Sequence, residues 1–331
     1  MNFFSIRHLT RFRYSGPVSE SIMEARMHPR SDSNQHCLQF SLSVSPRCRV
    51  FSYRDHLGNN VQHFDIPGEH QQLVIVAESL VEQQPMTDIP SFLSADAWSA
   101  LDDGVSKGDY WEFLMPSDFA RPTEALLGMA KELEVARRDD PMMLLQEINT
   151  RIYNFFSYVP RSTRVDSQID EAIESRQGVC QDFAHTMIAL VRSVGIPCRY
   201  VSGYLYHTRT HADRSTSDAT HAWVEAWLPH LGWVGFDPTN NLVAQYRHIR
   251  TAIGRDYADV PPTRGVFRGQ ADSELYVAVQ VDVHDQPPAL DREMPIPEDW
   301  SVLVEKAQQT ISAAPPHQPD LILIQQQQQQ Q

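Results

Sequence analysis

The chain has 331 residues and a formal net charge of −14, from 42 acidic residues against 28 lysines and arginines. This length allows two domains with buried cores, and the charge argues against a nucleic-acid partner because there is no surplus of basic side chains to displace counterions. The sequence has no apolar run near 20 residues and no evident signal peptide, and its four cysteines are too few for a disulfide framework. We therefore expect a cytoplasmic protein with no membrane partner.

The first 85 residues predict an all-β domain. Turn signals at Gly16-Pro17, at residues 56–59 and at Pro67-Gly68 separate short alternating stretches of apolar and polar residues. Several short strands with regular turns are typical of a sandwich-like domain. The predicted strands are Phe3 to Tyr14, His36 to Ser45, Arg49 to Asp55, Asn60 to Ile66 and Gln72 to Glu78.

Residues 86–120 have a mixed composition and predict a region that links two domains, with a short helix near Ser94 to Leu101. Two longer helices are expected at Thr123 to Arg137 and at Pro141 to Phe156. Asp140 is suited to cap the second of these, because a proline at the first helical position follows it.

A third helix is predicted from Cys180, and it ends at Gly195 and Pro197, which favour a C-cap and prevent resumption. Its apolar positions recur at spacings of four, three and four, at Phe183, Met187, Leu190 and Val194. Gly178 breaks the chain just before the thiol, so Cys180 is expected in the first turn. Backbone N–H groups there favour a thiolate and can donate to an oxyanion.

Residues 220–228 alternate as a strand with His221, Trp223, Glu225 and Trp227 on one face, and residues 233–237 predict a second strand that ends in Asp237. A three-residue loop, 229–231, would place Trp223 opposite Asp237, with His221 as the diagonal neighbour of Asp237. A register two residues different would place His221 and Asp237 directly opposite each other. Either hairpin presents imidazole and carboxylate on one face.

Cysteine, histidine and aspartate in this order supply a nucleophile, its base and a group that orients the base. Further along, Glu274 to His284 alternates as another strand, and prolines with seven terminal glutamines predict a disordered tail. We therefore expect a β-rich domain at residues 1–85, a linker at 86–120, a catalytic core at 121–286 and a tail at 287–331.

Three motifs, VCQDFAHTMIALVRSVGIPCRYVSGYL, THAWVEAWL and WVGFDPTNN, resemble the core of the transglutaminase-like superfamily over roughly residues 145–270. GRDYADVPPTRGVFRG is similar to the bacterial branch labelled cysteine protease, and FSIRHLTRFRYSGPVSES resembles its amino-terminal β-domain. The resemblance implies an α+β, papain-like fold and the triad Cys180, His221 and Asp237. Gln181 stands where animal transglutaminases carry tryptophan, and no acidic calcium loop is evident, which argues against a calcium-activated cross-linker.

A zinc site is the chemical alternative, although the sequence has no CxxC or HExxH motif. Its histidines are poorly placed, because two fall in a polar loop that borders the expected cleft and another is rotated away from the thiol. The candidate ligands are Cys180, His185, His207, His211 and His221. Tyr158 is a candidate second oxyanion donor, although packing is the favoured role for its ring. The segment from Arg255 to Tyr257 fits a structural ion pair as well as it fits a pocket.

The sequence thus predicts a cysteine enzyme that acts on peptide or isopeptide amide bonds through an S-acyl intermediate, with peptide or protein substrates. Hydrolysis is favoured, and no metal or organic cofactor is required. Transamidation of protein glutamine, and a non-catalytic binding or scaffold module, are the alternatives.

Overall fold

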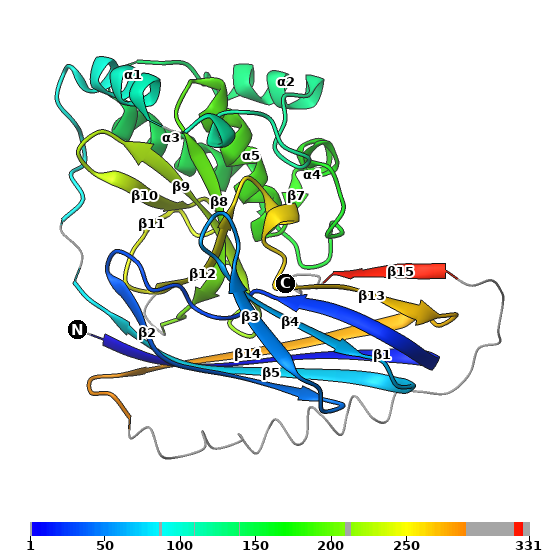
Figure 1. Cartoon of the computed structure of the whole chain (residues 1–331). Helices are drawn as coiled ribbons and strands as arrows, with labels where there is room; N and C mark the ends of the chain where they lie inside the picture. The colour runs from blue at the N-terminus through cyan, green and yellow to red at the C-terminus, as the bar shows by residue number, and fades with distance from the viewer. Residues whose placement is uncertain are drawn as a thin grey trace.

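The computed structural model describes residues 2–85, 88–108, 110–138, 140–208, 213–288 and the strand 321–326. Figure 1 shows long strands in its lower half and, above them, helices that cover a smaller sheet. We call the lower part the β domain and the upper part the α+β core. Within the described residues, no helix is both long and apolar enough to cross a membrane.

The β domain is built on one long strand, β1 (Asn2–Ala25). Its first half pairs with β5 (His70–Gln83) and β14 (Ser273–His284), and its second half with β4 (Asn60–Ile66) and β13 (Thr263–Gly269). The edges are extended by β2 (Gln35–Ser45), which pairs with β5, and by β3 (Val50–Arg54), which pairs with β4.

The two halves of β1 belong to two layers that share one core, as in a sandwich whose strands change sheets at a bend. Phe12 and Leu73 come from one layer, and Met23, Phe64 and Phe267 from the other. The pairing register shifts between Arg13 and Val18. The predicted turn at Gly16-Pro17 is therefore wrong, because β1 continues through these residues. At this point β1 changes from pairing with β5 and β14 to pairing with β4 and β13, and proline has no N–H to donate to a neighbouring strand.

The strands after residue 262 return to the β domain, whereas the sequence analysis assigned residues up to 286 to the core. β14 pairs with β1 over its whole length, from Phe3 opposite His284 to Tyr14 opposite Ser273. Alternation predicts that a segment is a strand but does not identify its partner, so this pairing could not be predicted. A further strand, β15 (Leu321–Gln326), pairs with β13 inside the predicted tail; residues 289–320 and 327–331 lie outside the described residues.

The helices of the α+β core include the predicted ones and add one, although α2 ends at Glu132 and not at Arg137 as predicted. They are α1 (Ala97–Lys107), α2 (Glu124–Glu132), α3 (Pro141–Phe155), α4 (Ile169–Ser175) and α5 (Cys180–Ser193), with a short 3-10 turn, η1 (Trp111–Phe113), after α1. Asp140 caps α3 as expected, because its carboxylate accepts N–H groups of Met142 and Met143. The seven-residue α4 offers too short an apolar pattern to be predicted.

The sheet of the α+β core is antiparallel, in the order β11 (Leu242–Ala244), β10 (Gly232–Asp237), β9 (His221–Leu228), β8 (Cys198–Leu205) and β12 (His248–Gly254). Helix α5 packs on one face of β8 and β9, and its residues from Cys180 to Arg192 are all buried. A 3-10 turn, η2 (Tyr257–Asp259), follows β12, and two short strands, β6 (Ser157–Tyr158) and β7 (Gln177–Gly178), form a parallel pair just before α5.

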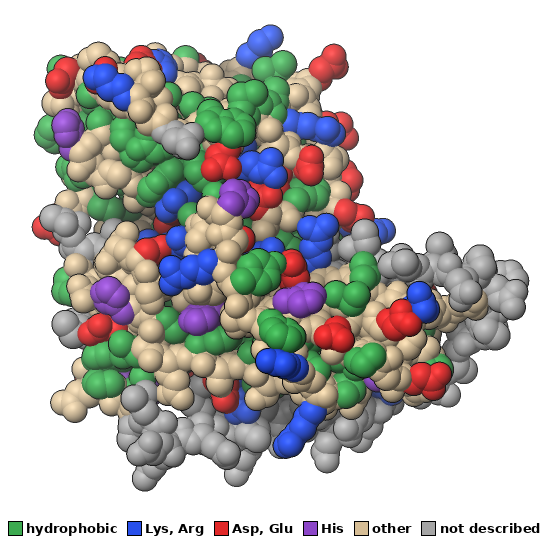
Figure 2. All heavy atoms as spheres, viewed as in Figure 1, with side chains coloured by type: hydrophobic (Ala, Val, Ile, Leu, Met, Phe, Trp, Pro, Cys, Tyr) green, Lys and Arg blue, Asp and Glu red, His purple; other side chains and the backbone are tan. Residues whose placement is uncertain are grey.

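The β domain binds the edge strand β12 through side-chain amides. Gln35 accepts the N–H of Arg250 and donates to its carbonyl, and Asn59 does the same for Ile253. These contacts satisfy backbone groups that a sheet edge would otherwise leave open. On the face viewed in Figure 2, acidic and basic side chains are interspersed over both parts.

Candidate active site

Cys180 is the first residue of α5 and is fully buried. The helix start is fixed by Asp182, whose Oδ2 accepts the N–H of Val179 at 2.8 Å and the hydroxyl of Thr163 at 2.6 Å. Gly178 is required beside this cap, because a Cβ there would lie 2.9 Å from the Cβ of Asp182. The sulfur of Cys180 in turn accepts the N–H of Ala222 at 3.2 Å. A backbone donor and a helix N-terminus therefore both face this sulfur, and both favour an anion.

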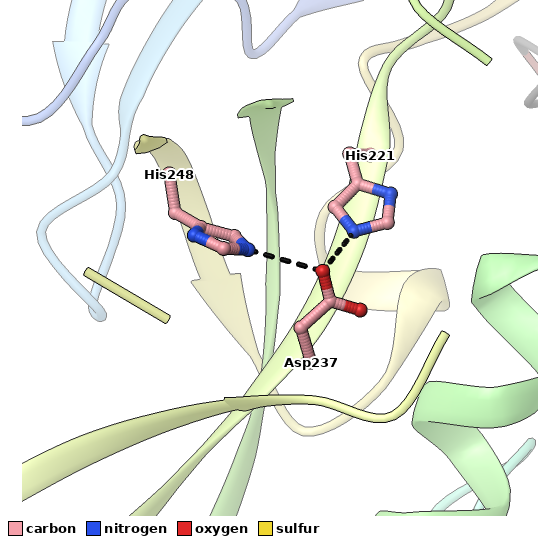
Figure 3. Close-up of side chains that lie close together, drawn as sticks. All are labelled: His221, Asp237 and His248. Atoms are coloured by element: carbon pink, nitrogen blue, oxygen red, sulfur yellow. Dashed lines mark hydrogen bonds and ion pairs between the residues drawn. The ribbon is translucent and has the colours of Figure 1, made fainter. Parts of the chain in front are cut away.

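The hairpin of β9 and β10 has the first of the two predicted registers. Trp233 pairs with Trp227 and Phe236 with Val224, so the loop is 229–231 and His221 is the diagonal neighbour of Asp237. Nε2 of His221 lies 2.8 Å from Oδ2 of Asp237 (Figure 3). Because Nε2 must donate to this carboxylate, Nδ1 is the nitrogen left to exchange a proton with another group.

Nδ1 of His221 is buried and has no hydrogen-bond partner among the described residues, while the N–H of the next residue, Ala222, donates to the sulfur of Cys180. Burial by itself lowers the pKa of His221, but the charge and hydrogen bond of Asp237, followed by the effect of Cys180, outweigh it and raise that pKa to about 10. The structure thus brings together the three residues that the sequence selected. All are buried, with 0 % of Cys180, 2 % of His221 and 0 % of Asp237 exposed, so a substrate reaches the sulfur only after neighbouring groups move.

The carboxylate of Asp237 is held by more donors than the sequence suggested. Oδ1 accepts the N–H groups of Thr239 and Asn240, and Oδ2 accepts the side-chain amide of Asn240 at 2.9 Å. Nε2 of His248 also donates to Oδ2, at 3.1 Å. Burial would raise the pKa of Asp237, but the two histidines outweigh it and lower that pKa. Asp237 is therefore a stable anion.

His248 was missed by the sequence analysis. It begins β12, which is separated from β9 by β8 in the sheet, and only the curvature of the sheet brings its ring to Asp237. The one available signal was a histidine at the start of an alternating stretch, HIRTAIG, and this pattern does not indicate which residue the ring contacts.

Asn240, which donates to the carboxylate of Asp237, also binds the loop that precedes β9. The Oδ1 atom of Asn240 accepts the N–H groups of Arg214 and Ser215, at 2.7 and 3.3 Å. The guanidinium of Arg214 donates to the carbonyls of Tyr153 and Phe156 at the end of α3. Hydrogen bonds thus hold the start of the 213–220 segment against Asn240 and the end of α3, next to the carboxylate of Asp237. Residues 209–212, including His211, lie outside the described residues.

The zinc ligands considered from the sequence do not assemble in the described part of the chain. Nε2 of His185 accepts the N–H of Tyr257 at 3.1 Å, and burial lowers the pKa of His185 to about 3. His207 lies 3.3 Å from a carboxylate oxygen of Asp213. His185 is therefore a neutral structural acceptor, as its rotation away from Cys180 predicted.

One group of metal-ligand type does occur among the described residues: His221, Asp237 and His248, whose ligand atoms lie within 4.8 Å of one another. Both Nε2 atoms already donate to Oδ2, and the amide of Asn240 donates to the same oxygen. A metal ion would have to displace these N–H donors. The donor set therefore fits a hydrogen-bonded carboxylate better than a preformed metal site.

Two other predicted positions have structural contacts. Tyr158 lies in β6 beside Gly178, and its ring centroid is 6.5 Å from that of Phe183. Burial raises the pKa of Tyr158, and the charge of Cys180 raises it further. Arg255 pairs with Asp259, and Asp256 accepts the N–H groups of Phe119 and Ala258. The segment from Arg255 to Tyr257 is thus a structural element.

Two family models match the chain: the bacterial transglutaminase-like N-terminal region over residues 4–82, and the transglutaminase-like superfamily over residues 130–238. An uncharacterized protein of Mycobacterium leprae is 32% identical over 275 residues, which cover 83% of this chain and 96% of that protein. An uncharacterized protein of Mycobacterium tuberculosis H37Rv is 33% identical over 291 residues, 85% of this chain and 92% of that protein.

A protein-glutamine gamma-glutamyltransferase of Pseudomonas aeruginosa is 37% identical over 137 residues, which are 38% of this chain and 20% of that protein. Among solved structures, a protein of Cytophaga hutchinsonii provisionally named a cysteine protease superposes with a TM-score of 0.65. It is 24% identical, and the match covers 89% of this chain and 92% of the other. This likeness shows a shared fold across both the β domain and the α+β core.

Proposed function

The chain belongs to the transglutaminase-like superfamily, and from this premise we propose that it is a cysteine-dependent acyl-transfer enzyme. Cys180 is the nucleophile, His221 the acid and base, and Asp237 the group that orients His221. The observation that carries the proposal is the arrangement at the start of β9. Nε2 of His221 donates to Asp237 and leaves Nδ1 without a partner among the described residues, while the N–H of the adjacent Ala222 donates to the sulfur of Cys180.

The thiolate of Cys180 attacks an amide carbonyl, and the oxyanion that forms is stabilised by N–H groups of the first turn of α5. His221 then gives the proton on Nδ1 to the departing amine, and the acyl group remains on sulfur as a thioester. In the second half, His221 takes a proton from water, or from an amine, as that molecule attacks the thioester. Asp237 stays ionised throughout and keeps Nε2 protonated.

We infer that the substrates are peptides or proteins with amide or isopeptide bonds, that hydrolysis is the main outcome and that the enzyme acts in the cytoplasm. Transamidation is the second candidate, and the relative named protein-glutamine gamma-glutamyltransferase favours it. The two differ only in whether water or an amine reaches the thioester. Neither requires a nucleic-acid or membrane partner.

The first test is acyl-enzyme formation with p-nitrophenyl acetate, a small activated ester that does not depend on peptide preference. Wild-type protein should release a burst of nitrophenol and gain one acetyl group on the peptide that contains Cys180, as seen by mass spectrometry. Cys180→Ser, which keeps the shape of the site, should give no burst. A wild-type protein with no burst and no acetylated Cys180 would favour the scaffold alternative.

The second test separates the two acyl transfers with carbobenzoxy-glutaminylglycine and a primary amine. Hydrolysis releases ammonia and leaves glutamate whether or not amine is added. Transamidation gives an amine adduct that grows with amine concentration at the expense of glutamate. The ratio of the two products shows whether water or the amine is the preferred acceptor, and release of glycine from the same compound would report cleavage of its peptide bond.

A further inference from the structure

The carboxylate of Asp237 serves two imidazoles through one oxygen. Figure 3 shows His221 and His248 approaching Oδ2 from different strands, with donor distances of 2.8 and 3.1 Å. A Cys–His–Asp mechanism requires only the first of these bonds. Hydrogen bonds from Thr239 and Asn240 already fix the orientation of the carboxylate. The additional hydrogen bond from His248 therefore acts on the charge of the carboxylate and not on its orientation.

His248 is a neutral donor. Because its Nε2 faces a carboxylate oxygen, Nε2 carries the hydrogen, and Nδ1 is buried with no hydrogen-bond partner in the described part of the chain. Burial lowers the pKa of His248, and His221 and Arg247 lower it further against the opposing effect of Asp237. The imidazole therefore donates one neutral hydrogen bond and does not compete for the proton that His221 carries.

The ring of His248 is held in place by packing. The indole of Trp223 meets the ring of His248 edge to face, with centroids 5.1 Å apart, and it also stacks against His221, with centroids 6.1 Å apart. Trp223 itself lies over Gly203, where an added Cβ would come within 2.7 Å of the indole. The main chain of His248 is fixed as well, since its carbonyl accepts the side-chain amide of Gln83.

Among the described residues, the charged groups around the two rings come from β9, from β12 and from the segments that connect the strands. Arg247 precedes His248 and pairs with Asp213, and His207 lies 3.3 Å from the same carboxylate. Burial, and then the charge of His221, lower the pKa of His207. On the β-domain side of the sheet, Glu225 and Arg250 line a cavity of about 20 Å³ that His248 also lines, and they form an ion pair. Within the described part of the chain, Asp237 is thus the carboxylate to which both imidazoles donate.

We propose that His248 is a positioning residue that divides the charge of Asp237 and so limits how strongly Asp237 holds the proton on His221. This inference rests on the proposed acyl transfer. In the second half of that reaction, water gives a proton to Nδ1 of His221 while its oxygen bonds to the thioester carbon. The tetrahedral intermediate then collapses, the carbon–sulfur bond breaks, the acid leaves, and the thiolate of Cys180 remains beside the imidazolium.

That step needs a neutral His221. In the acyl-enzyme the sulfur carries no charge, so Asp237 is the anion that still holds the proton on His221. If Asp237 accepted a hydrogen bond from His221 and not from His248, it would keep His221 protonated at neutral pH. A protonated His221 cannot take a proton from water, so deacylation would be slow. The hydrogen bond of His248 weakens the carboxylate as an acceptor for His221. His248 thereby allows the second half-reaction to run at neutral pH without changing the first.

The test compares His248→Leu, which removes the donor, with His248→Gln, whose amide nitrogen can occupy the place of Nε2. Both are assayed with p-nitrophenyl acetate from pH 5 to 10, and the burst reports acylation while the steady rate reports deacylation. The Leu variant should keep the burst, lose roughly tenfold or more of the steady rate at pH 7, and recover it at a pH about one unit higher. The Gln variant should restore most of the wild-type profile.

A second measurement does not depend on turnover. In a Cys180→Ala background, which lacks the thiolate as the acyl-enzyme does, the pKa of His221 is read by NMR with His, Gln, Leu or the shorter Asn at position 248. A higher pKa with Leu and Asn than with His and Gln supports the proposal.

Equal pKa values for His221 in all four proteins, or burst and steady rate falling together without a shift in pH, would overturn it and leave His248 a packing residue. A wild-type protein that forms no acyl-enzyme removes the proposed function itself, and that outcome is visible before any variant is made.

Discussion

Replacing Asp237 with asparagine should uncouple His221 from Cys180. The structure sets the size of this effect, because the pKa of His221 rises from 6.5 to about 10 against the effect of burial, and Asp237 is the largest cause of the rise. This rise corresponds to a preference of ~5 kcal/mol for the imidazolium. In Asp237→Asn the largest cause of the rise is gone and Cys180 alone opposes burial, so we expect the pKa of His221 to fall to about 6.5, where about a quarter of the rings stay protonated at pH 7.

The assay is the rate of iodoacetamide alkylation at each cysteine as a function of pH, followed by peptide mass spectrometry. With the imidazolium lost, alkylation of Cys180 at pH 7 should fall by roughly 10- to 1000-fold, and the difference from wild type should narrow above pH 9. Cys37 and Cys198 are internal controls, because burial raises their pKa values to about 11 and about 12. Their slow labelling should be the same in both proteins.

Asp218→Asn is the matched control, since it removes one negative charge from the exposed part of the loop before β9 and leaves the carboxylate of Asp237 in place. It should leave the Cys180 profile unchanged. If Asp237→Asn also left that profile unchanged while the protein stayed folded, the pairing of His221 with Asp237 would not be what activates the thiol. The proposed mechanism would then fail.

Three further outcomes follow from particular contacts. The raised pKa of His221 stabilises the fold fully below pH 6.5, and this stability is lost as the pH rises through about 10. Urea unfolding of wild type should therefore weaken between these values more than that of His221→Gln, and equal slopes would contradict the shift. Glu225 is 2 % exposed between Arg199 and Arg250, so Glu225→Ala should cost about 3–5 kcal/mol of unfolding free energy. The exposed pair of Glu132 and Arg176 is its control, and Glu132→Ala should cost less than about 1 kcal/mol. Tyr158→Phe should retain most of the acylation rate, because its ring packs on Phe183; a loss of about 100-fold would instead identify Tyr158 as an oxyanion donor.

The local parts of the site were predictable because their patterns lie within short stretches of chain. The apolar spacing after Cys180 and the glycines on either side determine where α5 begins and ends. The three-residue loop determines the register of β9 and β10, and through it the shared face of His221 and Asp237. The order of the three residues along the chain then indicates the chemistry.

Other features depended on contacts between segments far apart in the sequence. The N–H of Ala222 reaches the sulfur of Cys180 only after α5 packs on β9, and His248 reaches Asp237 only because the sheet curves across four strands. Likewise, β14 pairs with β1 across more than two hundred residues, although its alternation is the same as that of a strand with any other partner.

The sequence by itself therefore determined the helix, the hairpin and the three reactive side chains, since periodicity and loop length act over a few residues. Tertiary structure alone decided which strands pair, how the sulfur is buried and which second imidazole shares the carboxylate. These depend on how separate elements pack together, and side-chain patterns within one element carry no information about that packing partner.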